Sequence, residues 1–180
     1  MSYRITKVEV ACFPSNEAVG SAVGAFGISV DELRGLIEEF QCTASRRPGV
    51  GYQQHIADEL ERHLTRRLRA RGDLQTATTR YSPVLGERAD LAIAGREGGR
   101  RLYFEIEFRP NVEKDLVKFQ IGWNRERLAA AVLVLAVDRQ AVNPQYTSMP
   151  EFAKFARVIG ELRPVYPLLL VGISGDHIEP

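Results

Sequence analysis

The feature that most constrains the fold is a segment at residues 101–109 in which apolar and polar side chains alternate. Successive side chains of a β-strand point to opposite faces, so this alternation predicts a strand with two unlike faces. One face is entirely apolar and consists of Leu102, Phe104, Ile106 and Phe108. The other face carries Tyr103, Glu105 and Glu107. Two neighbouring carboxylates beside an aromatic ring repel each other and lose hydration, so the pattern favours a cation between them.

Asp90 provides a third carboxylate on an expected neighbouring strand. Residues 88–94 form a short apolar strand with Asp90 near its start, and the glycine-rich residues 95–100 would turn the chain back into the strand at 101–108. The two strands are therefore expected to be antiparallel neighbours. Three carboxylates brought together in this way suit a hard divalent cation.

The alternative is a surface strand that binds no metal. In that case Glu105 and Glu107 would lie on the solvated face of an edge strand, with Arg101 and Arg109 as cross-strand partners. The preceding Asp90 hairpin and a buried strand expected downstream favour the metal site over this alternative.

Hydrophobic periodicity and capping signals predict a mixed chain of helices and strands. Strands are expected at residues 5–13, 75–81, 88–94, 101–108, 129–137 and 168–173, and helices at residues 17–26, 29–40, 52–71, 112–127 and 150–162. Ser29 and Glu32 have the spacing of a capping box, and Gly72 suits a helix C-cap. From residue 52 the order is α-β-β-β-α-β-α-β, which predicts an α/β or α+β fold with helices on a central mixed sheet.

The length and composition of the chain limit the number of domains and the class of protein. A chain of 180 residues predicts one domain, with residues 51–180 as the core and residues 1–50 as an N-terminal elaboration packed on it. The net charge of +1 gives no global field that attracts nucleic acid, so any attraction must come from local patches. Cys12 and Cys42 form no metal-binding pattern and are expected to be reduced thiols of a cytoplasmic protein. No apolar run is long enough for a membrane span.

The order of elements and the acidic residues resemble the core of the PD-(D/E)XK nuclease superfamily, which includes many type II restriction endonucleases. The resemblance covers about residues 52–140 and rests on Glu59, Asp90, Glu105 and Glu107. It implies a restriction endonuclease-like core with the order α-β-β-β-α-β from about residue 52. Two positions depart from the family pattern. Glu107 stands where the family usually has lysine, as in a minority of restriction enzymes, and Ala89 replaces the proline before Asp90.

The resemblance also implies a cofactor and its ligands. Asp90, Glu105 and the backbone carbonyl of Ile106 would bind Mg²⁺, for which Mn²⁺ is a possible substitute. Glu107 would share that ion, bind a second one or hold the attacking water, and Glu59 would contact an outer water. Such an ion lowers the pKa of a bound water and acts as a Lewis acid in phosphodiester hydrolysis.

The expected activity is therefore Mg²⁺-dependent cleavage of DNA by an endonuclease of the restriction type. Cutting both strands of a duplex is simplest with two sites related by a two-fold axis, so a homodimer is expected. One alternative, favoured by Glu107 in the lysine position, is a catalytically inactive nuclease-fold module that binds DNA or protein. Another is an unrelated α/β protein whose acidic residues are surface charges. The recognition sequence and the choice of DNA or RNA are left open.

Helical geometry gives expectations for the side chains around the site. In the helix at residues 52–71, Glu59 falls at the edge of the apolar stripe and can face the site, whereas Asp58 and Glu61 point elsewhere. In the helix at residues 112–127, the inward face is expected to consist of Val112, Leu116, Phe119 and Trp123. Gln120 lies at the edge of that face and could point toward the site.

Basic side chains on the same two helices have several possible roles. Arg62, Arg66 and Arg69 would contact DNA phosphates, or would simply be cations placed favourably near a helix C-terminus. Lys114 and Lys118 could replace the missing family lysine. Both project away from the expected inward stripe, however, so solvent exposure is predicted for both.

Overall fold

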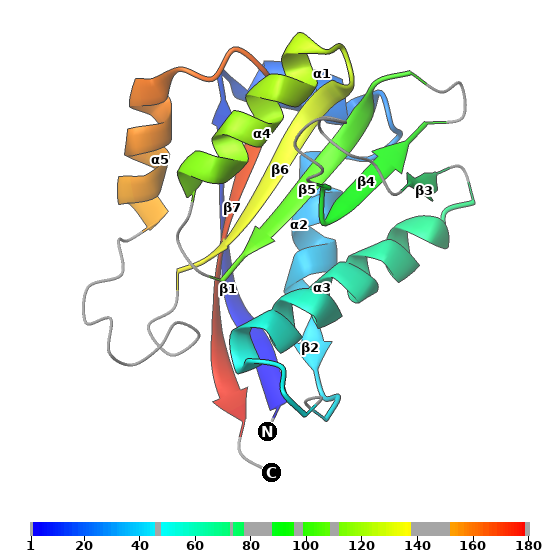
Figure 1. Cartoon of the computed structure of the whole chain (residues 1–180), viewed down its shortest axis with the longest axis vertical. Helices are drawn as coiled ribbons and strands as arrows, with labels where there is room; N and C mark the ends of the chain where they lie inside the picture. Colours follow the sequence, from blue (N-terminus) through cyan, green and yellow to red (C-terminus); the bar gives the residue numbers. More distant parts are fainter. Residues whose placement is uncertain are drawn as a thin grey trace.

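A single mixed sheet organises the chain (Figure 1). The computed structural model describes residues 2–45, 48–72, 74–77, 88–95, 99–108, 112–137 and 152–178. Its strands are β1 (Ser2–Phe13), β2 (Gln41–Cys42), β3 (Gln75–Ala77), β4 (Leu91–Ala94), β5 (Arg101–Glu107), β6 (Leu128–Ala136) and β7 (Leu168–Ile178). Its helices are α1 (Asn16–Gly24), α2 (Val30–Glu38), α3 (Tyr52–Arg69), α4 (Val112–Asn124) and α5 (Phe152–Leu162).

The strands lie in the order β2-β1-β7-β6-β5-β4-β3. β5, β6 and β7 are parallel to one another, and all the other neighbouring pairs are antiparallel. The predicted antiparallel pairing of β4 with β5 is confirmed, and so is the prediction that the apolar run of β6 joins the same sheet. The fold is therefore mixed α/β, with the expected α-β-β-β-α-β-α-β order from α3 onward.

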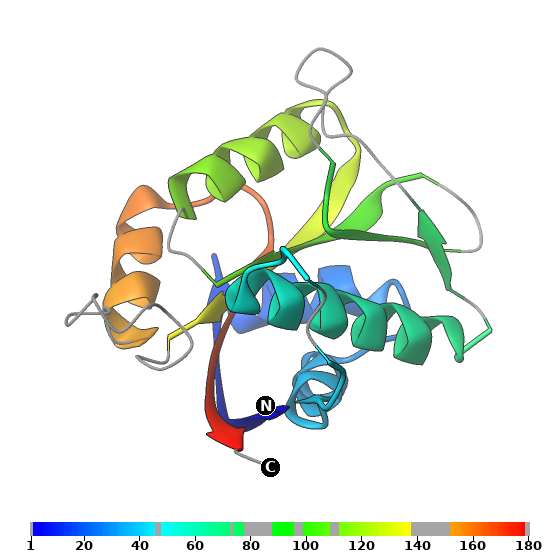
Figure 2. The same cartoon turned by 60° about the horizontal axis from the view of Figure 1, so that its bottom comes forward.

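Helices cover both faces of the sheet (Figure 2). The helices α1, α2 and α3 pack on one face, where their buried side chains share a core with the apolar side chains of β5. The helices α4 and α5 pack on the opposite face, around Phe119, Phe152 and Ile159. The predicted alternation of β5 is confirmed, because Phe104 lies in the first core and Tyr103 in the second. Glu105 and Glu107 therefore point to the α4 side.

Local sequence signals explain where several elements begin and end. Ser29 caps α2 through its Oγ, which accepts a hydrogen bond from the Glu32 backbone N–H at 3.0 Å, and the Glu32 carboxylate accepts one from Ser29 in return. This is the predicted capping box. Gly72 follows α3 with a φ of +73°, a left-handed conformation that favours glycine. The strand predicted at residues 75–81 is observed over Gln75–Ala77, and its remainder lies outside the described residues.

The N-terminal residues contribute directly to the sheet. β1 pairs with β7 over eleven residue pairs, and β2 extends the sheet beyond β1. Among the described residues, no helix is long and apolar enough to cross a membrane.

Gly175 of β7 occupies a position where a side chain does not fit. A Cβ atom there would overlap the Tyr3 ring and lie 2.6 Å from the Arg4 carbonyl oxygen. We expect Gly175→Ala to lower the free energy of unfolding by about 2 kcal/mol in chemical denaturation, because the β1–β7 backbone must shift. The control is Gly35→Ala in α2, where a Cβ meets open space and a gain of about 0.5 kcal/mol is expected. An equal effect of the two substitutions would contradict this account.

Candidate metal centre

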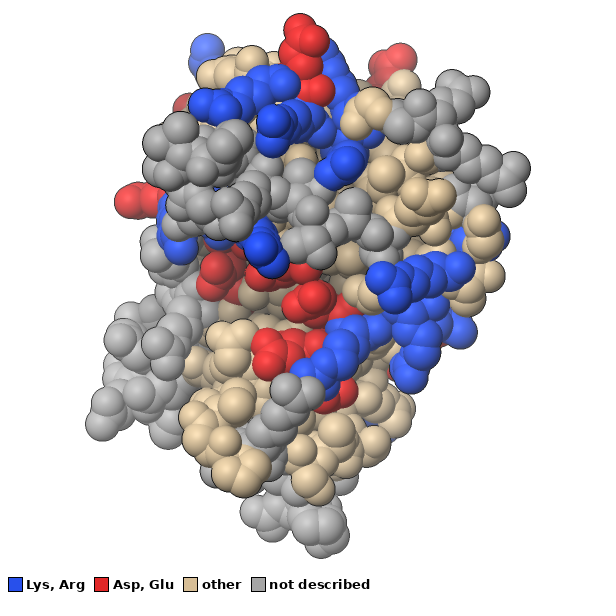
Figure 3. Space-filling model, turned by 45° about the vertical axis from the view of Figure 1, so that its right-hand side comes forward, with Lys and Arg blue, Asp and Glu red and all other residues tan. Residues whose placement is uncertain are grey.

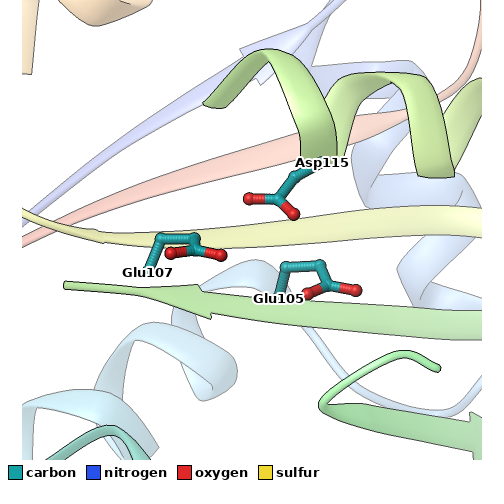
Figure 4. Close-up of side chains that lie close together, drawn as sticks. All are labelled: Glu105, Glu107 and Asp115. Carbon is teal, nitrogen blue, oxygen red and sulfur yellow. The ribbon is translucent and has the colours of Figure 1, made fainter. Parts of the chain in front are cut away.

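Three carboxylates from two elements converge on the α4 face of the sheet. Glu105 and Glu107 project from β5, and Asp115 projects toward them from α4 (Figure 4). Each residue offers one oxygen such that all three oxygens lie within 4.8 Å of one another. Glu105 and Asp115 are buried, and Glu107 is half-buried. The predicted pair on β5 is thus joined by an acidic residue of α4 that the sequence did not indicate.

Lys118 bridges two of these carboxylates. Its Nζ lies 3.0 Å from Glu105 Oε2 and 2.9 Å from Asp115 Oδ1. Only 7 % of Lys118 is exposed, so the expectation that this side chain faces solvent is wrong, whereas Lys114 is exposed as predicted. Asp115, Lys118 and Gly122 follow helical spacing along one buried flank of α4, but periodicity alone does not distinguish this flank from the flank of Gln120.

Asp90 approaches the same cluster from the start of β4. The β4–β5 register pairs Leu91 with Phe104, so the preceding Asp90 falls beside Glu105. Its Oδ2 accepts a hydrogen bond from the Ile106 backbone N–H at 2.7 Å. Asp90 keeps exposed surface as a residue, but this bond holds its carboxylate against β5. The four acidic side chains and Lys118 form one unit, called the acidic cluster below.

Burial and like charge disturb the titration of the cluster. Burial raises the pKa of Glu105 to about 8, and the charge of Asp90 adds to the rise while Lys118 opposes it. Burial also raises the pKa of Glu107 to about 7, with the Asp115 carboxylate as the next cause. The pKa of Asp90 is raised by burial as well. Burial alone would lower the pKa of Lys118, but its carboxylate neighbours outweigh burial and raise it, so the ammonium stays charged.

Helix α3 carries acidic residues on two flanks. Glu59 pairs with Arg62 on its own helix, and no contact between Glu59 and the cluster is seen among the described residues. Burial raises the pKa of Glu61, and the charges of Asp90 and Asp58 add to the rise, so Glu61 is electrostatically coupled to Asp90. The expectation that Asp58 and Glu61 point elsewhere stays a prediction.

The helical pattern of α3 is symmetric about its apolar stripe. The apolar stripe of α3 is built on Ile56, Leu60, Leu64 and Leu68. Glu59 and Glu61 flank that stripe at about 100° on opposite sides. Periodicity gives the stripe but does not say which of the two flanks lies nearer β4.

The remaining predicted site residues lie outside the cluster. Gln120 donates a hydrogen bond to Asn124 Oδ1 at 2.8 Å and lines a groove between α4 and α5, away from the carboxylates. Arg62, Arg66 and Arg69 are exposed on α3. In Figure 3 acidic side chains gather in a hollow of one face, and Lys and Arg side chains border that hollow.

The donor atoms of the cluster suit a hard cation. Two of its buried oxygens, Glu105 Oε1 and Asp115 Oδ2, have no hydrogen-bond partner among the described residues. Buried carboxylate oxygens without a partner are costly, and a divalent ion would satisfy them. Glu105, Glu107 and Asp115 are the residues that would hold such an ion.

Proton linkage predicts how stability depends on pH without metal. Glu105 and Glu107 titrate in the folded protein near pH 8 and pH 7, against an ordinary value of 4.5. Between pH 4.5 and pH 8 the folded state therefore binds more protons than the unfolded chain, so the free energy of unfolding falls as pH rises. For Glu105 each pKa unit of difference between the folded and unfolded states is worth about 1.4 kcal/mol. We expect a lower free energy of unfolding near pH 8 than near pH 5 in EDTA, and a flatter profile for Glu105→Gln.

Comparison of the sequence with models of known protein families gives no match, and comparison with curated proteins gives none either. The geometry of the acidic cluster therefore carries the functional proposal.

Proposed function

We propose that the protein is a metal-dependent endonuclease that hydrolyses DNA phosphodiester bonds. The observation that carries the proposal is the convergence of Glu105 and Glu107 of β5 with Asp115 of α4. Asp90 lies beside them, held by the Ile106 backbone N–H, and Lys118 completes the cluster. The succession of a helix, three antiparallel strands, a helix and a parallel buried strand is the one expected of a restriction endonuclease-like core.

The cluster provides the groups that phosphodiester hydrolysis needs. Glu105, Glu107 and Asp115 would hold Mg²⁺ or Mn²⁺, which when bound activates water and offsets charge on phosphate oxygens. Glu107 is half-buried, whereas Glu105 and Asp115 are buried, so Glu107 is the carboxylate of the three that is placed to hold the attacking water. Lys118 keeps its proton, so it acts as a fixed positive charge beside the reacting phosphate rather than as a base.

The position of Lys118 bears on the departure from the family pattern. Glu107 occupies the position at which the family usually has lysine, but the ammonium of Lys118 reaches Glu105 from α4. A lysine is thus restored to the cluster from a different element. The exposed arginines Arg62, Arg66 and Arg69 are the proposed contacts to the DNA backbone, through charge rather than base recognition.

The direct test is a cleavage assay on supercoiled plasmid and on linear duplex DNA. We expect nicked or linear products with Mg²⁺ or Mn²⁺ and none with EDTA. Single-stranded DNA and duplex RNA serve as competing substrates that identify the nucleic acid. Absence of cleavage on all of them with either ion would reject the endonuclease.

The second candidate is a nuclease-fold module that binds DNA or protein without cleaving. It is favoured by the contacts of Lys118, which already places a positive charge between Glu105 and Asp115 where an ion would lie. The two candidates differ in metal binding. Calorimetry with Mg²⁺ and Mn²⁺ gives binding for the enzyme and none for a cluster closed by Lys118.

A further inference from the structure

An apolar groove runs between α4 and α5, on a different side of α4 from the acidic cluster. Its volume is about 890 Å³. All four large apolar side chains that stay exposed in the described part of the chain line it, and these are Val117, Val158, Leu162 and Val165. Each of the four is more than half exposed. Exposed apolar side chains gathered around a concave surface indicate a binding site.

The size of the groove fits a small molecule better than a protein. Pockets that bind small molecules have volumes of about 300–1,000 Å³ and are lined mostly by apolar side chains, and the groove agrees in both respects. Fourteen of the described residues line it. A stable protein–protein interface uses about 20–30 residues on each side, so the groove is smaller than such an interface.

The groove has two different ends, because its two helices run in the same direction (Figure 1). The strands β5, β6 and β7 are parallel, α4 lies between β5 and β6 in the chain, and α5 lies between β6 and β7. Both helices therefore run back against the strand direction. The first turns of α4 and α5 lie toward one end of the groove, and their last turns lie toward the other.

The charged residues that line the groove differ between these ends. Among the described residues they are Glu113, Lys154 and Arg163. Glu113 and Lys154 belong to the first turns of their helices, so opposite charges meet at that end. Arg163 follows the last residue of α5, and no carboxylate among the lining residues offsets its charge there. Arg157 and Glu161 pair with each other outside the groove. The end at Arg163 is thus complementary to an anion.

Arg163 also has a backbone conformation that favours glycine. Its φ is +49°, and its backbone N–H donates to the Gly160 carbonyl oxygen at 3.2 Å, as in a helix that ends with a left-handed residue. A side chain in this conformation costs free energy, and residues held in this way cluster at ligand-binding sites. Glycine would end the helix at a lower cost, so the helix end does not explain the arginine.

We propose that the groove binds an apolar monocarboxylic acid, of the class of medium-chain fatty acids, with its carboxylate at Arg163. The guanidinium would donate hydrogen bonds to the carboxylate, and the acyl chain would lie over Leu162 and Val158 toward the start of α5. Lys154 precedes Arg163 by about 14 Å along the helix axis, which a decanoate chain nearly spans. This inference does not rest on the proposed function, because it uses none of the carboxylates of the acidic cluster.

The test is isothermal titration calorimetry of the full chain with decanoate, in EDTA and below the micelle concentration of the acid. We expect one decanoate to bind per chain. Decanol has the same chain without the charge and should bind at least about tenfold more weakly. Acetate has the charge without the chain and should give no measurable binding.

Arg163→Gly separates contact with the carboxylate from the role of this residue in ending the helix. We expect about tenfold weaker binding of decanoate and unchanged binding of decanol. Thermal unfolding without ligand should occur at the same or a higher temperature, because glycine suits the left-handed conformation. Lys154→Gln is the matched control, since it removes a lining cation at the other end of the groove, and it should change the decanoate affinity less than about twofold.

Val158→Glu tests whether the acid lies in the groove. The substitution adds a carboxylate among the apolar side chains at an exposed position, so the protein should fold and lose binding of both decanoate and decanol.

Three outcomes would overturn the proposal. The first is the absence of decanoate binding to the wild type, which is expected if a partner protein covers the groove. The second is equal affinity for decanoate and decanol, which would leave Arg163 without a role. The third is unchanged decanoate binding in Val158→Glu, which would place the acid at an adventitious site elsewhere.

Discussion

Glu105→Gln is expected to abolish metal-dependent DNA cleavage, with a rate lower by about three orders of magnitude or more. Glu105 lies in the acidic cluster and is 1 % exposed. One of its oxygens is held by Lys118, and the other has no hydrogen-bond partner within the described part of the chain. Glutamine keeps the volume of the side chain but removes the charge that a divalent ion needs. The measurement is plasmid cleavage, with Mg²⁺ affinity followed independently by calorimetry.

The matched control for this variant is Glu113→Gln, because Glu113 is an exposed acidic residue of α4 that faces the groove between α4 and α5 and not the acidic cluster. It should leave cleavage and metal affinity unchanged. The Glu105→Gln protein should be at least as stable as the wild type near pH 8 without metal, because a buried carboxyl with a raised pKa is removed. Cleavage at the normal rate in Glu105→Gln would refute the metal centre.

The second large effect is expected for Lys118→Met. The substitution removes the only cation whose contacts with the buried oxygens of Glu105 and Asp115 are seen in the described residues. Removing one partner of a buried ion pair costs about 3 kcal/mol or more, because the remaining charge is left without compensation. We expect this loss near pH 8 in EDTA and a smaller loss near pH 5, where protons neutralise the carboxyls. Denaturant unfolding at both pH values measures it.

Lys114→Met controls for the loss of a lysine from α4. Lys114 is exposed, so a change of less than about 0.5 kcal/mol is expected. Added Mg²⁺ should restore part of the stability of Lys118→Met if an ion can take the place of the ammonium. An equal loss in both lysine variants would show that Lys118 has no special role in the cluster.

The sequence predicted the parts of the fold that depend on short-range patterns. The alternation of apolar and polar residues in β5 predicts its two unlike faces and the face that carries its two glutamates. The apolar run of β6 indicates a strand that is covered on both faces of the sheet. The hairpin relation between β4 and β5 followed from an intervening turn. These signals were sufficient to predict that Asp90 lies close to Glu105 and Glu107.

The helical contributions to the site could not be obtained in the same way. On α3 and on α4 the apolar stripe is flanked by polar residues on both sides, and the sequence does not say which flank faces the cluster. On α4 the pattern favours Gln120, whereas the structure turns the flank of Lys118 toward the carboxylates. On α3 the pattern favours Glu59, whereas the charge of Asp90 acts on Glu61. The choice depends on how each helix is rotated on the sheet, which is a property of tertiary packing.

The place of β7 in the sheet has a consequence for synthesis of the chain. β7 is the most C-terminal strand described, and it lies between β1 and β6 (Figure 1). Without β7, the sheet falls into two separate pieces, one of β2 and β1 and the other of β6, β5, β4 and β3. A nascent chain on the ribosome therefore exposes an unpaired edge of each piece until β7 emerges. The complete sheet is expected to form only after β7 has left the ribosome, at the rate set by non-local strand pairing.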